Sequence, residues 1–163
     1  GYGFLDYYLL FRNKERNILG MDYDEDKIKV AQHNFDKTEN LNFIQGDLRK
    51  LKIKSKQDVI LVMDVLHYFN AEDQRKVLVE CIQNLNTDGI IFIRDGIKDL
   101  AERHANTKVT EFISSNIGFN KVSEDFCFFE KKFIEELATE FNLTVEMQEH
   151  SEKTSNVLFV LRH

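Results

Sequence analysis

Apolar residues from position 1 to about 96 alternate between two spacings, that of a helix with one buried face and that of a buried strand. Unbroken or alternating apolar runs predict four strands, at 17–22, 42–45, 58–64 and 89–95. Apolar residues three and four positions apart predict helices over 4–14, from 24 onward and from 70 onward. Asp24 and Asn70 begin the last two, because their side chains can accept hydrogen bonds from the free N–H groups of a first turn. Regular alternation of helices and strands is typical of an open α/β sheet.

The spacing changes after Gly96. Residues 97–129 are mostly polar, with a short helix expected over 110–115, and we interpret them as an insertion rather than another strand–helix unit. A helix follows, with apolar residues on one side at Phe133, Ile134, Leu137 and Phe141. Two strands near 143–148 and 157–161 end the chain, and a connection without a helix makes them antiparallel. A turn is expected at 86–89, and the unbroken run at 58–64 indicates a strand covered on both faces.

Composition narrows the class of protein. The chain has 163 residues, of which 42% are hydrophobic and 31% are charged, so one globular domain over residues 1–163 is expected. No apolar run approaches the roughly 18 residues of a membrane span. The two cysteines, Cys81 and Cys127, exclude a disulfide-rich secreted scaffold and fit a reducing compartment, so we expect a cytoplasmic protein. A net charge of −6 without a block of Lys or Arg argues against nucleic acid as the main partner.

Ligands of open α/β sheets bind beyond the carboxyl ends of the strands, so the residues that follow each strand are the candidates for a site. Gly1 and Gly3 form a turn before the first helix, where a backbone without Cβ atoms can approach a ligand closely. Asp22 ends the next strand, 19 positions after Gly3, a spacing that suits a carboxylate bound to a ribose diol. A plain turn and a solvated loop acid are the alternative interpretations of these residues.

Polar residues also follow the later strands. Asp47 could accept a hydrogen bond from an adenine amino group while the amide of Leu48 faces the ring; the alternative is a simple Gly-Asp turn. Asp64 and His67 follow the third strand, and residues 94–96 follow the fourth, so both segments would rim a pocket. His67 could act as a base because imidazole titrates near neutral pH. The alternative is a histidine that packs or hydrogen-bonds beside the sheet.

Five segments in this order resemble the motifs of the class I S-adenosylmethionine-dependent methyltransferases. They are Gly-Tyr-Gly at 1–3, Ile-Leu-Gly-Met-Asp at 18–22, Phe-Ile-Gln-Gly-Asp at 43–47, Asp-Val-Ile-Leu-Val-Met-Asp-Val-Leu-His-Tyr at 58–68 and Leu-Asn-Thr-Asp-Gly-Ile-Ile-Phe-Ile-Arg-Asp at 85–95. The resemblance implies a three-layer, Rossmann-like open sheet that is mostly parallel and ends in an antiparallel hairpin. Because the Asn/Asp-Pro-Pro-Tyr motif of enzymes that methylate nucleic-acid amino groups is absent, it also implies a small-molecule acceptor.

The resemblance implies roles for individual residues around S-adenosylmethionine. Gly1 and Gly3 would lie beside its methionine moiety. Asp22 would bind the ribose hydroxyls, with Met21 and Tyr23 flanking the adenosine, and Asp47 and Leu48 would contact the adenine. The segment from Asp64 to His67 would face the reacting methyl group, and residues 97–129 would be an insertion or lid on the substrate side. His67 and His104 are the candidate bases. We expect no metal, because the acids at 22 and 24–26 are explained by a ribose ligand and the first turn of a helix.

One departure from the family stands out. The family's first strand, which is central in its sheet, precedes the residue that is Gly1 here, so we expect a longer protein whose first strand is missing from this chain. Its absence would leave unpaired edges on the neighbouring strands and favour a dimer across the gap. Two other functions stay open, a non-catalytic methyltransferase-like module and a nicotinamide-dependent oxidoreductase. Asp6 stands where the third glycine of a nicotinamide-type G-x-G-x-x-G motif would be.

Overall fold

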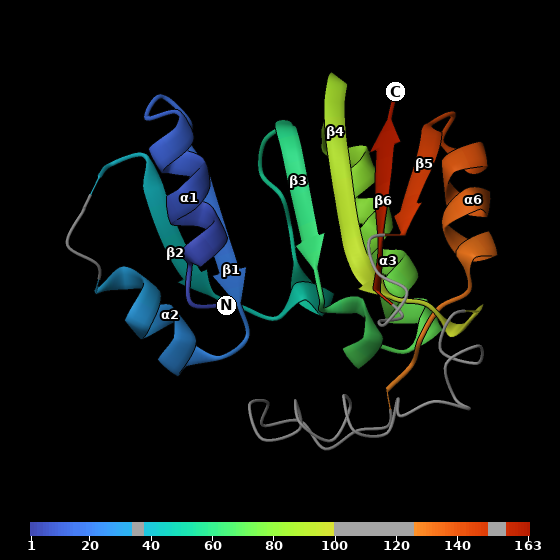
Figure 1. The fold of residues 1–163 in the computed structure, drawn as a ribbon, viewed down its shortest axis with the longest axis horizontal. Helices are drawn as coiled ribbons and strands as arrows, with labels where there is room; N and C mark the ends of the chain where they lie inside the picture. Colours follow the sequence, from blue (N-terminus) through green and yellow to red (C-terminus); the bar gives the residue numbers. More distant parts are fainter. Residues whose placement is uncertain (34–37, 100–125, 150–155) are drawn as a thin grey trace. The chain divides into compact units, whose positions relative to one another are not determined.

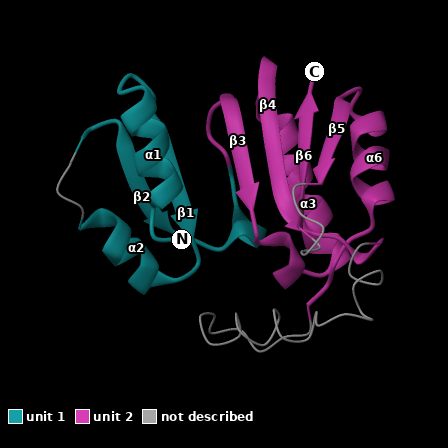
Figure 2. Cartoon of the chain, in the orientation of Figure 1, with its two compact units in different colours: residues 1–52 teal, residues 53–163 magenta. Residues whose placement is uncertain are grey.

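The computed structural model describes residues 1–33, 38–99, 126–149 and 156–163 (Figure 1). These residues form two compact units (Figure 2), residues 1–52, which we call unit 1, and residues 53–163, which we call unit 2. The single domain expected from chain length stays a prediction. Each unit is an α/β structure with its own sheet and its own core.

Unit 1 contains two short parallel strands and the helices that precede each of them. Its elements are α1 (Phe4–Arg12), β1 (Ile18–Asp22), α2 (Glu25–Gln32), β2 (Leu41–Gln45) and the 3-10 turn η1 (Leu48–Lys50). The strands pair in register from Ile18 opposite Leu41 to Asp22 opposite Gln45. The residues after both strands therefore lie at one edge of the sheet. Asp24 caps α2 as predicted, because its side chain accepts from the N–H groups of Asp26 and Lys27.

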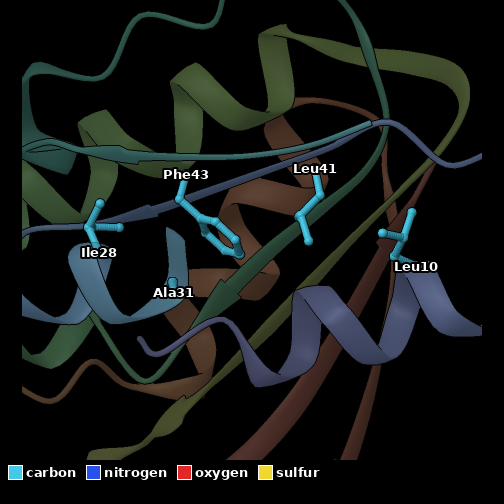
Figure 3. Packing of buried hydrophobic residues seen from close by; sticks show 5 residues of the cluster. All are labelled: Leu10, Ile28, Ala31, Leu41 and Phe43. Carbon is cyan, nitrogen blue, oxygen red and sulfur yellow. The ribbon is translucent and has the colours of Figure 1, made fainter. Parts of the chain in front are cut away.

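The core of unit 1 is small and centred on β2. Figure 3 shows the side chains of Leu41 and Phe43 pointing toward the side where the two helices contribute their buried residues, Leu10, Ile28 and Ala31. The ring of Phe43 lies so close to β1 that a Cβ at Gly20 would come within 2.6 Å of it. Glycine at position 20 is therefore a packing requirement of this core.

Unit 2 is built on a four-stranded mixed sheet with the strand order β3-β4-β6-β5. Its elements are β3 (Gln57–Met63), η2 (Leu66–Tyr68), α3 (Ala71–Gln83), β4 (Leu85–Gly96), α6 (Lys131–Glu140), β5 (Thr144–Glu149) and β6 (Asn156–Arg162). β3 and β4 are parallel, whereas β6 pairs antiparallel with both β4 and β5. β6, the last strand in sequence, therefore lies between β4 and β5. Asn70 caps α3 as predicted, since its side chain accepts from the N–H of Asp73.

The predicted α/β class, with parallel strands and an antiparallel pair at the end, is confirmed by these pairings. Two details differ from the sequence prediction. The residues expected as a turn at 86–89 belong to β4, where the pairing with β3 shifts between Gln57 and Val59. In β3 only Val62 is buried, and Val59 is 51% exposed, although burial on both faces was expected. The physical reason is that, among the described residues, β3 is at the edge of its sheet, so its side chains have a neighbouring strand on one side and not on the other.

β1 and β3 each pair with one strand in the described ranges, β2 and β4 respectively. One edge of each strand is thus without a partner among the residues that the structure describes. A dimer formed across these edges stays a prediction.

Candidate functional site

In unit 1, Asp22 stands at the carboxyl end of β1 and is tied to the end of β2. Its backbone oxygen accepts from the N–H of Gly46 at 2.9 Å, which holds the two strand ends together. Its Oδ1 accepts from the N–H of Asp24 at 2.8 Å, and its Oδ2 contacts the amino group of Gly1. The side chain keeps 22% of its surface exposed. One carboxylate oxygen therefore shapes the turn into α2, and the other is held by Gly1.

The predicted neighbours of Asp22 divide into surface and core residues. Tyr23 is 60% exposed, whereas Met21 is half-buried, with its sulfur 3.2 Å from where a Cβ at Gly46 would lie. Gly3 is buried and has a left-handed backbone, with φ of 79°, which favours glycine. A Cβ there would also lie 2.8 Å from the Phe43 ring. The packing of unit 1 thus explains Gly3 by itself, and its predicted contact with a cofactor stays a prediction.

Asp47 is engaged by a neighbour in sequence. Its carboxylate accepts from the backbone N–H of Arg49 at 3.0 Å and forms a two-pronged ion pair with the Arg49 guanidinium, with Nη2 to Oδ2 at 2.8 Å. This hydrogen-bonded guanidinium lowers the pKa of Asp47. Leu48, the next residue, is half-buried. An adenine amino group would have to share a carboxylate that Arg49 already holds.

In unit 2, Asp64 is in an unusual backbone conformation at the end of β3. Its φ is 51°, in the left-handed region that few residues other than glycine adopt. Its N–H donates to the backbone oxygen of Arg94 at 2.7 Å, and its carboxylate pairs with the guanidinium of the same residue. Partial burial raises the pKa of Asp64, and the nearby charge of Asp95 adds to the rise, while Arg94 opposes it.

His67 follows three residues later and is held by a buried acid. Its Nδ1 lies 2.6 Å from Oδ1 of Asp95, which is 1% exposed and lies near the end of β4. The same carboxylate accepts from the backbone N–H groups of Val65, Leu66 and Gly96, at 3.0, 2.8 and 2.8 Å. Because an ionised carboxylate can only accept hydrogen bonds, the proton of this contact belongs to Nδ1 of His67, and Nε2 is the acceptor of the neutral ring. No described residue bonds to Nε2.

Aromatic side chains surround the His67 ring. The ring centroid of His67 lies 4.1, 5.3 and 5.9 Å from those of Tyr68, Phe126 and Phe128. We call His67 and these three residues the ring cluster. All four side chains are half-buried. Phe128 packs against Gly96, where a Cβ would lie 2.8 Å from its ring.

A buried amide on α3 joins the two segments that carry the ring cluster. Nε2 of Gln74, on α3, lies 3.1, 3.0 and 2.6 Å from the backbone oxygens of Leu66, Phe69 and Cys127. The N–H of Cys127 donates in turn to the backbone oxygen of His67 at 2.9 Å. Segments that are far apart in the chain, the turn after β3 and residues 126–128, are thus joined in one network.

The structure therefore groups the predicted site residues by unit. Unit 1 holds those predicted to bind the cofactor at the end of β1 and beyond β2, and unit 2 holds Asp64 and His67. His104 lies outside the described residues, as does most of the predicted insertion. Sequence reasoning missed the partnership of His67 with Asp95 and the parts played by Gln74, Phe126 and Phe128. A glutamine on the apolar face of α3 and the Phe-Cys-Phe-Phe run at 126–129 were the signals that could have found them.

Other chemistry in the described ranges is sparse. Within them, no group of three or more His, Cys, Asp or Glu side chains is arranged to hold a metal ion. None of the helices in these ranges has the length and apolar character needed to cross a membrane. Both cysteines are free, and burial raises the pKa of the Cys81 thiol to about 12, so this thiol is unreactive near neutral pH.

Comparison with known proteins identifies the family. Residues 1–89, more than half of the chain, match the family model described as a methyltransferase domain. The chain belongs to this family. The match confirms the resemblance to S-adenosylmethionine-dependent methyltransferases and favours them over the nicotinamide-dependent alternative. No curated protein sequence matches the chain.

Solved structures confirm the fold. An O-methyltransferase family protein from Burkholderia thailandensis superimposes with a TM-score of 0.73 at 16% identity, over 100% of this chain and 48% of that one. The N-methyltransferase NodS from Bradyrhizobium japonicum, in complex with S-adenosylhomocysteine, gives a TM-score of 0.68 at 16% identity, over 99% and 73%. LepI in complex with S-adenosylmethionine gives 0.68 at 16% identity, over 99% of this chain but only 40% of LepI. The chain thus spans less than half the length of two of these three proteins.

Proposed function

We propose that this protein transfers a methyl group from S-adenosylmethionine to a small-molecule acceptor. The observation that carries the proposal is the position of Asp22, a partly exposed carboxylate at the carboxyl end of β1, in a chain of the methyltransferase family. Ligands of open α/β sheets bind at this end of the strands. The S-adenosylhomocysteine bound to NodS and the S-adenosylmethionine bound to LepI support the same cofactor here.

Most residues of unit 1 fit the cofactor. Asp22 has one oxygen outside the turn, which the amino group of Gly1 contacts and a ribose hydroxyl would have to share. Tyr23 exposes a ring beside it that could cover the adenosine. Asp47 fits less directly because Arg49 already contacts both of its oxygens. The cofactor, when bound, supplies an activated methyl group on a positively charged sulfur. What the protein must add is alignment of the acceptor and exclusion of water.

Unit 2 holds the candidate base. His67 has a described acceptor atom, Nε2, without a partner among the described residues, and Asp95 fixes the orientation of its ring. It is the base of the proposed reaction where the acceptor carries a proton. The absence of an Asn/Asp-Pro-Pro-Tyr motif after β3 supports a small molecule rather than a nucleobase as the acceptor.

Calorimetry with S-adenosylhomocysteine tests the proposal. We expect the unaltered chain to bind it, and Asp22→Ala to weaken binding about tenfold or more, because a hydrogen bond to a charged group contributes about 1.5–3 kcal/mol. Asp24→Ala is the matched control. It removes a helix cap two residues away, so it should leave the affinity unchanged and lower stability by about 1 kcal/mol.

Three outcomes would count against this function. Equal affinities of the two variants would remove Asp22 from the site. Binding of a nicotinamide dinucleotide without any response to S-adenosylhomocysteine would overturn the cofactor. Cofactor binding without methyl transfer to any acceptor would favour the non-catalytic module.

A further inference from the structure

The first helix of unit 1, α1, carries apolar side chains on both of its sides. Leu10 points from the helix into the core of unit 1 (Figure 3), and Tyr7 packs against the same core. Phe4, Tyr8 and Phe11 are exposed, and their spacing of four and three residues places them along one stripe of the helix. Apolar residues all round a helix are typical of a buried element. The exposed stripe is therefore a candidate contact surface.

Two neighbouring side chains extend this stripe into a patch. Tyr2 precedes the helix, and its ring centroid lies 6.5 Å from that of Phe4. Leu5 is exposed as well. Single exposed apolar residues are common on proteins, whereas a contiguous group of them marks an interaction site. We call the exposed apolar residues at the start of the chain the α1 patch, which consists of Tyr2, Phe4, Leu5, Tyr8 and Phe11.

Arg12 is the one cation of α1, and it is bound to the patch. Its guanidinium carbon lies 5.9 Å from the ring centroid of Tyr8, and its Nη1 donates to the Tyr8 hydroxyl at 3.0 Å. Asp6, the one acid of α1, is half-buried and lies toward β1, with Oδ1 3.0 Å from where a Cβ at Gly20 would be. Because guanidinium groups stack on aromatic rings, Arg12 suits an aromatic partner as well as an acidic one.

We propose that the α1 patch is the interface of a symmetric dimer, in which α1 of a second copy of this chain packs antiparallel against it. With the two-fold axis near Tyr8, Phe4 of each copy would lie against Arg12 of the other, because these residues are equally far before and after Tyr8. Leu5 would lie against Phe11 of the other copy for the same reason. The patch thus contains both halves of the contact, and a symmetric contact closes at two copies.

The area of the α1 patch supports a second copy. Tyr2, Phe4, Tyr8 and Phe11 are 40, 83, 54 and 79% exposed, and a fully covered ring of this kind buries roughly 150–250 Å², so the four rings offer on the order of 500 Å². A second copy contributes the same area again. The total of about 1,000 Å² is the size at which specific interfaces begin. We therefore expect a weak, reversible dimer.

Charge also permits this contact. Residues 1–52 contain nine Lys or Arg and nine Asp or Glu residues, so unit 1 is neutral although the chain carries a net charge of −6. Two copies of unit 1 can therefore approach with little repulsion. An anionic membrane would favour several cations around the rings, and α1 supplies one, Arg12. The α1 patch is separate from the open edges of β1 and β3, and the inference goes beyond the proposed function, since it involves neither cofactor nor acceptor.

Sedimentation equilibrium of the full chain, from about 1 µM to about 1 mM, tests the inference. We expect the mass to rise reversibly from that of one chain to that of two. Phe4→Gln and Phe11→Gln should each raise the dissociation constant about tenfold or more, because each removes a ring from the centre of a small interface. Val30→Gln is the matched control. Val30 is also exposed but lies on α2, so its replacement should leave the dissociation constant unchanged.

Two further measurements keep the result clear of folding effects. Phe4 and Phe11 are exposed, so both variants should unfold at the urea midpoint of the unaltered chain under monomeric conditions. If a variant does not fold, amide NMR of the unaltered chain decides instead, because signals of α1 should shift with concentration while those of β5 stay in place.

Several outcomes would overturn the dimer through α1. One is a chain that stays monomeric at the highest concentration, and another is assembly beyond two copies. A dimer that persists in the Phe4→Gln, Phe11→Gln double variant, or concentration-dependent shifts in β1 and β3 without shifts in α1, would place the contact at the strand edges. Binding of α1 to vesicles of phosphatidylserine and phosphatidylcholine, without self-association, would identify a membrane as the occupant instead.

Discussion

The two units hold their acids in different ways. In unit 1, Asp22 and Asp47 are bonded through their side chains to Asp24 and Arg49, each two residues further along the chain. In unit 2, Asp95 bonds to Val65, Leu66 and His67, 28 to 30 residues away, and is almost completely buried. Unit 1 thus holds these acids mainly through close neighbours in sequence, whereas in unit 2 a buried network of distant residues fixes the direction of a histidine ring.

The hydrophobic cores of the two units differ in size. Unit 1 buries five apolar residues under a two-stranded sheet, and sheets of two strands are marginal without helices packed on them. Unit 2 has four strands and fully buried side chains from several elements, among them Ile91, Ile134 and Phe159. We therefore expect unit 1 to be the less stable part, and the following experiments test that difference.

The largest effect is expected from removing the central ring of each core. Phe43→Ala should cost about 3–5 kcal/mol, more than the small core of unit 1 can lose, so amide protection should disappear from β1 and β2 and persist in β4 and β6. Phe159→Ala, the matched variant of unit 2, should remove protection from β4 and β6. Hydrogen exchange measured by NMR distinguishes them. Loss of both sets together in Phe43→Ala would mean that the chain unfolds as one domain.

The two kinds of acid can be compared by the same substitution. Asp95→Asn places an amide N–H group among backbone donors, so we expect a loss of about 1–3 kcal/mol in thermal or urea unfolding of unit 2. Asp22→Asn keeps an oxygen for the N–H of Asp24 and should change stability by less than about 0.5 kcal/mol. Equal losses would show that burial and long-range bonding give Asp95 no special role.

Close packing in unit 1 is tested at two glycines. Gly20→Ala puts a methyl group 2.6 Å from the Phe43 ring and 3.0 Å from Oδ1 of Asp6, so we expect about 1–3 kcal/mol of destabilisation. Gly46→Ala meets only the flexible side chain of Met21 and should be close to neutral. Urea unfolding followed at β1 measures both. A neutral Gly20→Ala would mean that unit 1 is loosely packed.

The smallest effects concern pH, and their signs are opposite in the two units. Arg49 lowers the pKa of Asp47 below its ordinary 3.8, so the pair stabilises unit 1 fully above that pH and the contribution is lost as the pH falls through the lowered pKa. Burial raises the pKa of Asp64 above 3.8, so its ionisation destabilises unit 2 at neutral pH, and this penalty disappears as the pH falls to 3.8.

Two variants separate these contributions. Arg49→Ala should cost less than about 1 kcal/mol at neutral pH and nothing at a pH where Asp47 is protonated. Asp64→Asn should remove the part of the pH dependence of unit 2 that comes from this group. Titration of the carboxyl carbons by NMR measures each acid directly. Midpoints of Asp47 and Asp64 that move in the same direction would contradict this assignment.

Patterns along the chain were sufficient to locate the elements, because helix and strand periodicity and cap residues act over a few neighbours. They predicted α1, α2 and α3 with caps at Asp24 and Asn70, and the strands that end in or next to Asp22 and Asp64. The ordered strand-end motifs were also sufficient to indicate the family. These signals depend on neighbours in sequence, so they can be identified without knowing which segments pack together.

How His67 is held, by contrast, depends on the tertiary structure. Its partner Asp95, the amide of Gln74 and the rings of Phe126 and Phe128 lie 7 to 61 residues away in the sequence and meet because of the strand order β3-β4-β6-β5 and the packing of α3. Periodicity likewise did not predict that Val59 is exposed or that Arg49 forms an ion pair with Asp47. Hydrogen-bond partners and burial depend on which distant segments the fold brings together. Periodicity and cap residues report only on neighbours in sequence, so they do not predict these contacts.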